Sequence, residues 1–253
     1  MKKIPALITT LIVFLLPFFA GSVNTLDHGA NGDGDFMNTI AIQSAIDQCY
    51  EQGGGTVYVP AGRFRTGTII LKSHVSLYLE AGAFILGSTE LKDYPEIYPD
   101  FRSYTDVNYV DKSLIYAEKA ENISICGRGT IDGQGEEDAF DLPGRKNYKK
   151  RPYIIRMVEC QDVRISDVSL INSAMWVRHY LACEDLVIDG ISVRSLVNHN
   201  NDGIVLKATA PTDCEQTCIS NFICAGTDTV GCSITGIPGF EVQNITLRDI
   251  HIS

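Results

Sequence analysis

The chain has 253 residues, with 21 Lys and Arg against 31 Asp and Glu, and a formal net charge of −10. Such an acidic protein is a poor candidate for binding nucleic acid or an anionic membrane surface, and it repels a polyanionic ligand unless a groove is locally basic. Its length suits one domain with a sizeable core.

Residues 1–22 have the pattern of a segment that directs export. Lys2 and Lys3 precede an almost wholly apolar run of 17 residues, 4–20, and small residues follow it. This order is typical of a secretory signal peptide. A membrane anchor is the alternative, since the run falls just short of the roughly 20 residues that span a bilayer. We expect an exported protein, periplasmic or extracellular, with a mature domain at 23–253 that is not held in a membrane.

A short amphipathic helix is expected near the start of the mature chain, over residues 38–50. Asn38 or Thr39 can serve as its N-cap, and three glycines at 53–55 end it. Because a repeating domain must cover its open end, this helix is predicted to cap the first repeat. Its apolar residues recur at helical spacing: Ile42, Ala45, Ile46 and Cys49.

The chain then repeats a short alternating segment. QDVRISDVSLINS begins at Gln161 and EDLVIDGISVRSL at Glu184, 23 residues later, and each follows a cysteine, Cys160 or Cys183. Alternating apolar and polar residues are the pattern of half-buried strands, and a period in the low twenties suits one coil of a solenoid. We therefore predict an all-β domain, a right-handed single-stranded parallel β-helix with a short N-terminal capping helix.

The repeat also predicts a register. Equivalent positions of successive coils lie about one strand spacing apart, roughly 4.8 Å. Val163 is therefore expected to stack on Leu186, and Cys160 on Cys183. The two cysteines form either an inert buried stack, which we favour, or a disulfide, which needs a particular torsion as well as proximity.

Two long segments without any period, 92–112 and 134–151, are predicted to be loops. Long loops on a rigid scaffold commonly line binding sites. The second loop ends in RKNYKKR at 145–151, the densest basic run of the chain. This run is suited to attracting an acidic polysaccharide, but we interpret it as a solvated loop.

Several motifs follow one another in a fixed order: GTIDGQG at 129–135, RPYIIRMVECQDVRISDVSLINS from Arg151, SAMWVRHY from Ser173 and VNHNNDG from Val197. In this order they resemble the polygalacturonase-like glycoside hydrolases of family 28, which are pectin-active parallel β-helix proteins. The resemblance implies a secreted monomer that hydrolyses glycosidic bonds of pectic polysaccharide with inversion, of the polygalacturonase or rhamnogalacturonan hydrolase type. It implies no metal and no organic cofactor.

In that family, aspartates on neighbouring coils carry the reaction. One protonated carboxyl gives a proton to the leaving oxygen and an ionised partner activates water, with the two roughly 6.5–9.5 Å apart. The residue that matches is Asp202, in the segment NNDG, and the resemblance implies that Asp202 is catalytic and that Asn200 binds substrate. A turn is the alternative interpretation, because Asn-Asp-Gly is itself a turn signal.

Two parts of the family pattern are missing from the sequence, which contains neither an Asp-Asp dipeptide nor a Gly-His-Gly motif. The final DIHIS stops where another coil is expected and should leave an uncapped edge. We therefore expect an incomplete domain. An alternative function stays open, that of a catalytically impaired carbohydrate-binding β-helix. No catalytic role is assigned to His179, His199 or Lys207.

Overall fold

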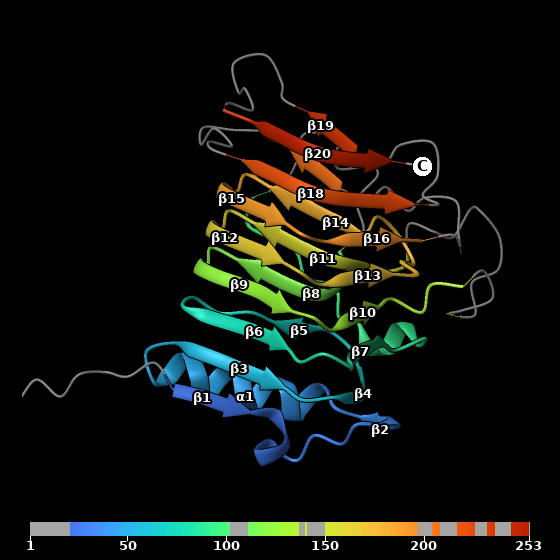
Figure 1. The fold of residues 1–253 in the computed structure, drawn as a ribbon. Coiled ribbons are helices and arrows are strands. Elements are labelled where there is room, and N and C mark those ends of the chain that lie inside the picture. The colour runs from blue at the N-terminus through green and yellow to red at the C-terminus, as the bar shows by residue number, and fades with distance from the viewer. Residues whose placement is uncertain are drawn as a thin grey trace, which may run out of the picture.

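The computed structural model describes residues 21–101, 111–136, 140, 150–195, 197, 204–207, 217–225, 232–235 and 244–252. Parallel strands stack along a common axis from the N-terminal to the C-terminal end (Figure 1). The predicted all-β parallel β-helix with an N-terminal capping helix is thus confirmed. In the described ranges, no helix has the length and apolar character needed to cross a membrane.

The strands form three rows, one per face of the solenoid. The first row holds β1 (Gly21–Asn24), β3 (Gly55–Val59), β6 (Val75–Leu79), β9 (Glu121–Gly127), β12 (Gln161–Ser166), β15 (Glu184–Asp189), β18 (Cys218–Ala225) and β20 (Thr246–Ile252). The second row holds β2 (Asp33–Met37), β4 (Gly62–Thr66), β7 (Ala83–Gly87), β10 (Thr130–Asp132), β13 (Ser169–Ile171) and β16 (Ser192–Arg194), which pairs with the end of β18. The third row holds β5 (Ile69–Ile70), β8 (Ser113–Glu118), β11 (Tyr153–Val158), β14 (Arg178–Leu181), β17 (Ile204–Lys207) and β19 (Cys232–Thr235).

The predicted register between coils is confirmed. Val163 pairs with Leu186 in the ladder between β12 and β15, and both side chains are buried. The start of each of these strands repeats as well, because the second residues, Asp162 and Asp185, both have a left-handed backbone, with φ of 50° and 51°. Such a conformation is tolerated by Asp better than by most residues. The 23-residue period therefore repeats the backbone conformation at the start of the strand as well as the buried core positions.

Helix α1 (Thr39–Glu51) covers the first coils, as predicted, with Ile42 and Ile46 fully buried (Figure 1). Asn38 is the N-cap residue, but its side chain makes no capping hydrogen bond. Its amide instead accepts from the Asn31 N–H at 2.6 Å and donates to the Phe36 carbonyl at 2.8 Å. Asn38 thus organises the turn that leads into the helix.

The two ends of the described chain differ. Gly21 and Ser22, which the sequence places in the leader, form the first residues of β1 and pair with β3, while residues 1–20 lie outside the described ranges. At the other end β20 pairs with β18 and with no other described strand. Leu247 of β20 pairs with Ile219 but is 50% exposed, against 1% for Ile219. The last described coil therefore leaves core positions uncovered.

Candidate functional site on the third row of strands

The third row contains the strand that follows the predicted catalytic residue. Asn200 and Asp202 themselves lie outside the described residues, and the sequence places them directly before β17. β17 pairs in parallel with β14 on one side and β19 on the other. The strands β11 and β14 precede β17 in this row, so their outer face adjoins β17.

One residue from each strand lines up across that face, in the order Tyr116, Arg156, His179 and Val205. Successive side chains of a strand point to opposite faces. Because Ile155, which precedes Arg156, belongs to the core, the Arg156 side chain points outward. The same holds for Tyr116, which follows the core residue Ile115. This alignment brings a cation next to two aromatic rings.

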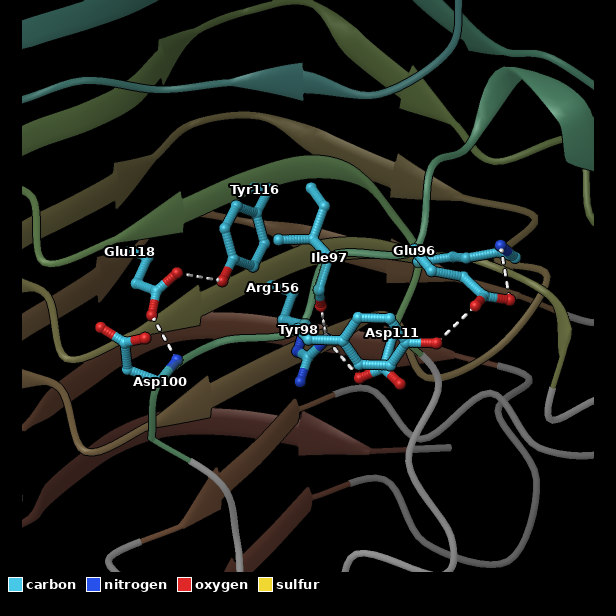
Figure 2. A network of polar contacts seen from close by, with 9 residues as sticks. Glu96, Ile97, Tyr98, Asp100, Asp111, Tyr116, Glu118 and Arg156 are labelled. Atoms are coloured by element: carbon cyan, nitrogen blue, oxygen red, sulfur yellow. Dashed lines mark hydrogen bonds and ion pairs between the residues drawn. The ribbon is translucent and has the colours of Figure 1, made fainter.

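Arg156 anchors the loop that runs over the outer face. Its Nη1 lies 3.5 Å from Oδ1 of Asp111 and 3.5 Å from the carbonyl oxygen of Ile97 (Figure 2). The Ile97 N–H donates in turn to the Asp111 carbonyl at 2.7 Å. Only 3% of the Arg156 surface is exposed. A guanidinium so enclosed holds the loop to β11 and is not open to a ligand in this conformation.

Glu118 at the end of β8 provides a second anchor. Its Oε1 accepts from the Asp100 N–H and its Oε2 accepts from the Tyr116 hydroxyl, both at 2.9 Å (Figure 2). Lys119 Nζ donates to Oδ2 of Asp100 at 2.6 Å, which lowers the pKa of that carboxyl. Burial raises the pKa of Tyr116, so its hydroxyl stays a donor. Residues 94–101 are therefore fixed against β8 and β11 at several points.

Three aromatic rings pack beside Arg156 at the start of β14. The His179 ring stacks on Tyr153, with centroids 5.5 Å apart and planes at 25°, and lies 5.8 Å from Trp176. Trp176 also lies 5.9 Å from Tyr153, so the three rings form one packed cluster. Burial, together with the Arg156 charge, lowers the pKa of His179 to about 3. His179 is therefore a neutral imidazole at physiological pH.

The GTIDGQG motif is used in packing between coils. A Cβ on Gly135 would lie 2.3 Å from Cα of Ala174, and one on Gly133 would lie 2.8 Å from the carbonyl oxygen of Asn172. Oδ1 of Asp132 accepts from the Gln134 N–H at 2.9 Å and from Nδ2 of Asn172 at 3.1 Å. The motif therefore positions the chain that leads into β14, and its aspartate is engaged in that role.

The basic run 145–151 is described only at its end. Arg151 is buried, its Nη1 donates to the Glu136 carbonyl at 3.3 Å, and its Cζ lies 5.9 Å from the centre of the Phe140 ring. For Arg151 the solvated-loop interpretation is wrong, because the side chain is buried against Glu136 and Phe140. His199 and the side chain of Lys207 lie outside what the structure describes.

A metal ion has no evident place in the described ranges. No group of three or more His, Cys, Asp or Glu side chains within them is arranged to hold one. The carboxylates on the outer face of the third row, Asp111 and Glu118, are engaged by Arg156, Tyr116 and the Asp100 N–H.

Sequence reasoning missed Arg156 and its contacts with the loop. The loop itself was predicted as a segment that lines a binding site, and the alternation in YIIRMV places Arg156 on the outer face once Ile155 is assigned to the core. Its partner could not be named, because Asp111 is 45 residues away in the chain and no periodic signal links the two.

Comparison with known proteins agrees with the fold and with the order of the motifs. The sequence matches the family model "Glycosyl hydrolases family 28" over residues 49–251. It is 34% identical to a probable polygalacturonase of Vitis vinifera, in an alignment 222 residues long that covers 83% of this chain and 44% of that protein. It is 30% identical to an exo-poly-alpha-D-galacturonosidase of Dickeya chrysanthemi, in an alignment 227 residues long that covers 72% of this chain and 37% of that protein.

The structure is similar to that of a hyperthermoactive exopolygalacturonase from Thermotoga maritima. The TM-score is 0.70 at 25% sequence identity, over 85% of this chain and 55% of that one. The chain spans less than half the length of the two curated relatives. Since the family match covers most of the sequence, from α1 to β20, the chain belongs to the glycosyl hydrolases of family 28.

Proposed function

We propose that this chain hydrolyses glycosidic bonds in pectic polysaccharide outside the cytoplasm, as a polygalacturonase or rhamnogalacturonan hydrolase that inverts the anomeric centre. Asp202 is the catalytic carboxyl and Asn200 binds substrate. The protein works as a monomer without a metal or an organic cofactor. Residues 1–22 form the signal peptide, and residues 23–253 form the catalytic domain.

This proposal is supported mainly by the family match across residues 49–251. It is also supported by the place of Asn200 and Asp202 in the sequence, directly before β17. β17 belongs to a row whose outer face is bordered by a firmly anchored loop. Glycoside hydrolysis requires an acid or base held in a fixed position, and a residue that precedes a paired parallel strand in the sequence is suited to that requirement.

Inversion needs a second carboxyl roughly 6.5–9.5 Å from the first, so that a water molecule fits between it and the sugar. We assign neither Asp111 nor Glu118 to that role. Asp111 lies against Arg156, and Glu118 accepts hydrogen bonds from Asp100 and Tyr116. The sequence contains no Asp-Asp dipeptide to supply the partner.

Reducing ends released from polygalacturonate and from a rhamnogalacturonan backbone test the proposal. The mature chain should release reducing ends from one of the two, and Asp202→Asn should lower the rate by at least about a hundredfold, the lower range for a general acid or base. Proton NMR of the first product should show the inverted anomer. A wild-type rate equal to that of Asp202→Asn would refute the catalytic assignment.

A carbohydrate-binding protein without turnover is the second candidate function. The missing Asp-Asp dipeptide favours it. It predicts that the mature chain is retarded in a gel that contains polygalacturonate while no reducing ends are released. Under this function Asp202→Asn leaves the retardation almost unchanged, since no proton transfer is involved.

A further inference from the structure

Tyr98 is an aromatic residue exposed on the loop that covers the third row. Tyr98 is 56% exposed, which is more than any other aromatic residue in the described part of the chain. Leaving so large an apolar ring in water costs free energy that burial would recover. Singly exposed aromatic rings are ordinary on protein surfaces, but Tyr98 differs because its hydroxyl and the backbone beside it are both held in place next to the third row.

The backbone on which Tyr98 stands is held from both sides. The preceding residue, Ile97, donates its N–H to the Asp111 carbonyl at 2.7 Å, and its own carbonyl lies 3.5 Å from Nη1 of Arg156. Its side chain packs against a buried cluster on the outer face of the third row: Tyr116, Val158 and Leu181. The ring of Tyr98 is therefore presented by a fixed backbone.

The hydroxyl end of the ring is held as well. Tyr98 donates to Oε2 of Glu96, whose Oε1 forms an ion pair with Lys112 Nζ at 3.2 Å (Figure 2). Lys112 also donates to the Tyr94 carbonyl at 3.1 Å. A tyrosine restrained at its hydroxyl and at its backbone loses little conformational entropy when a ligand stacks on it, and this preorganisation favours binding.

The location of the loop suits a chain of sugars that crosses the third row. The loop is anchored to β8 and β11, and β17 lies two strands beyond β11, roughly 10 Å away at the usual strand spacing. A pyranose ring has an apolar face of C–H groups that packs on an aromatic ring. A short oligosaccharide is long enough to touch both the loop and the start of β17.

We propose that Tyr98 stacks against a sugar ring of the substrate, and that Arg156 is the positioning residue that holds the loop presenting it. This inference rests on the proposed function and names a part of its substrate site. Arg156 acts through Ile97 and Asp111. It does not touch the substrate, because its guanidinium is enclosed.

The first experiment compares Tyr98→Ala with Tyr98→Phe in titration calorimetry with oligogalacturonates of defined length and in steady-state kinetics. Tyr98→Ala should raise Kd and KM about tenfold with kcat within about twofold, because a stacking contact acts on substrate and transition state alike. Tyr98→Phe keeps the ring and should stay within about threefold of wild type. Tyr50→Ala is the control, since Tyr50 is a similarly exposed tyrosine on α1.

The second experiment tests Arg156 independently of turnover. Hydrogen exchange should be faster in peptides spanning residues 94–101 in Arg156→Ala, and less so in Arg156→Lys, which keeps the charge. Lys72→Ala removes an ion pair with Asp47 near α1 and should leave that exchange unchanged. The double variant Tyr98→Ala/Arg156→Ala should bind no more weakly than Tyr98→Ala alone, since coupled residues are not additive.

The outcomes separate the two proposals. If the wild type neither binds nor cleaves either polygalacturonate or the rhamnogalacturonan backbone, the proposed function fails and this inference fails with it. If the wild type binds but Tyr98→Ala binds equally well, only the sugar-stacking role is overturned. If the two substitutions are additive in Kd, or if exchange of residues 94–101 is unchanged in Arg156→Ala, the positioning role is overturned.

Discussion

Gln43 and Ile70 exchange two hydrogen bonds at the edge of the third row. Oε1 of Gln43 accepts from the Ile70 N–H at 2.7 Å, and Nε2 donates to the Ile70 carbonyl at 3.1 Å. Since β5 is the edge strand of its sheet, the Gln43 amide takes the position that a further strand would occupy. Helix α1 therefore closes the solenoid through backbone pairing as well as through its apolar side chains, which is how an open sheet edge is blunted.

Replacing Gln43 with Ala should lower the free energy of unfolding by roughly 1–2 kcal/mol, because each intramolecular hydrogen bond contributes about 1 kcal/mol net. Urea denaturation of the mature chain measures this. Ile40→Ala on the same helix is the control, since Ile40 is exposed and should change stability by less than about 0.5 kcal/mol. Equal effects of the two substitutions would show that the amide does not close the edge.

The parts of the fold that recur with the repeat could be predicted from the sequence. Val163 and Leu186 occupy equivalent positions in segments 23 residues apart, so stacking coils fixes their contact without further information. The capping helix was predictable for a similar reason, because Ile42 and Ile46 lie on one helical face. In both cases the signal lies within a short stretch of chain.

The loop contacts could not be predicted, because they depend on where an irregular segment folds back. Arg156 meets Ile97, 59 residues earlier, and Glu118 meets Asp100 through a backbone N–H that leaves no mark in the sequence. The motif GTIDGQG was recognised as a family feature, but the packing role of Gly135 emerges only from the close approach of Ala174. The predicted site residues Asn200 and Asp202 remain predictions.

Gly135→Ala should destabilise the mature chain by about 3 kcal/mol or more. A Cβ at this position would lie 2.3 Å from the backbone nitrogen and Cα of Ala174, and backbone atoms inside a stacked coil cannot move aside cheaply. The midpoint of thermal unfolding measures the effect. Ile40→Ala is again the control, since Ile40 is 83% exposed and its substitution should leave the midpoint nearly unchanged. Equal midpoints would contradict the close packing of the motif.

Cys160 and Cys183 should remain unlinked thiols in the folded protein, as favoured from the sequence. Neither is joined in a disulfide, both are buried, and the Sγ atoms donate to backbone carbonyls, Cys160 to Val158 at 3.4 Å and Cys183 to Met157 at 3.5 Å. Although a hydrogen bond from Cys183 lowers the pKa of Cys160, burial shields both thiols from reagents. Alkylation followed by peptide mapping without reductant should find both unmodified in buffer and both modified in urea.

A disulfide-linked pair of peptides containing residues 160 and 183 would refute that prediction. The same mapping after unfolding under mild oxidation supplies the control, because the two thiols are then free to meet and the linked peptide should form. Comparing the folded with the unfolded chain isolates the effect of folding, which fixes the side-chain torsions of both cysteines.

His179 makes stability depend on pH through its neutral, buried ring. Its folded pKa is about 3 and its ordinary value is 6.5, so the unfolded chain takes up a proton first as pH falls. The contribution of His179 to the free energy of unfolding has its full value above pH 6.5 and is lost progressively as the pH falls towards 3. Between pH 7 and pH 5 the free energy of unfolding should fall by about 2 kcal/mol on this account.

Urea denaturation of wild type and His179→Gln at pH 7 and pH 5 isolates this contribution. Glutamine keeps polar atoms near Tyr153 and Trp176 but has no proton to gain, so the variant should lose about 2 kcal/mol less than wild type over that interval. His74→Gln is the matched control, because His74 is a partly exposed histidine paired with Glu121 on the first row. If wild type and His179→Gln show the same pH dependence, the His179 ring is not held neutral by burial, and the packing of Tyr153 and Arg156 around it must be looser than the contacts indicate.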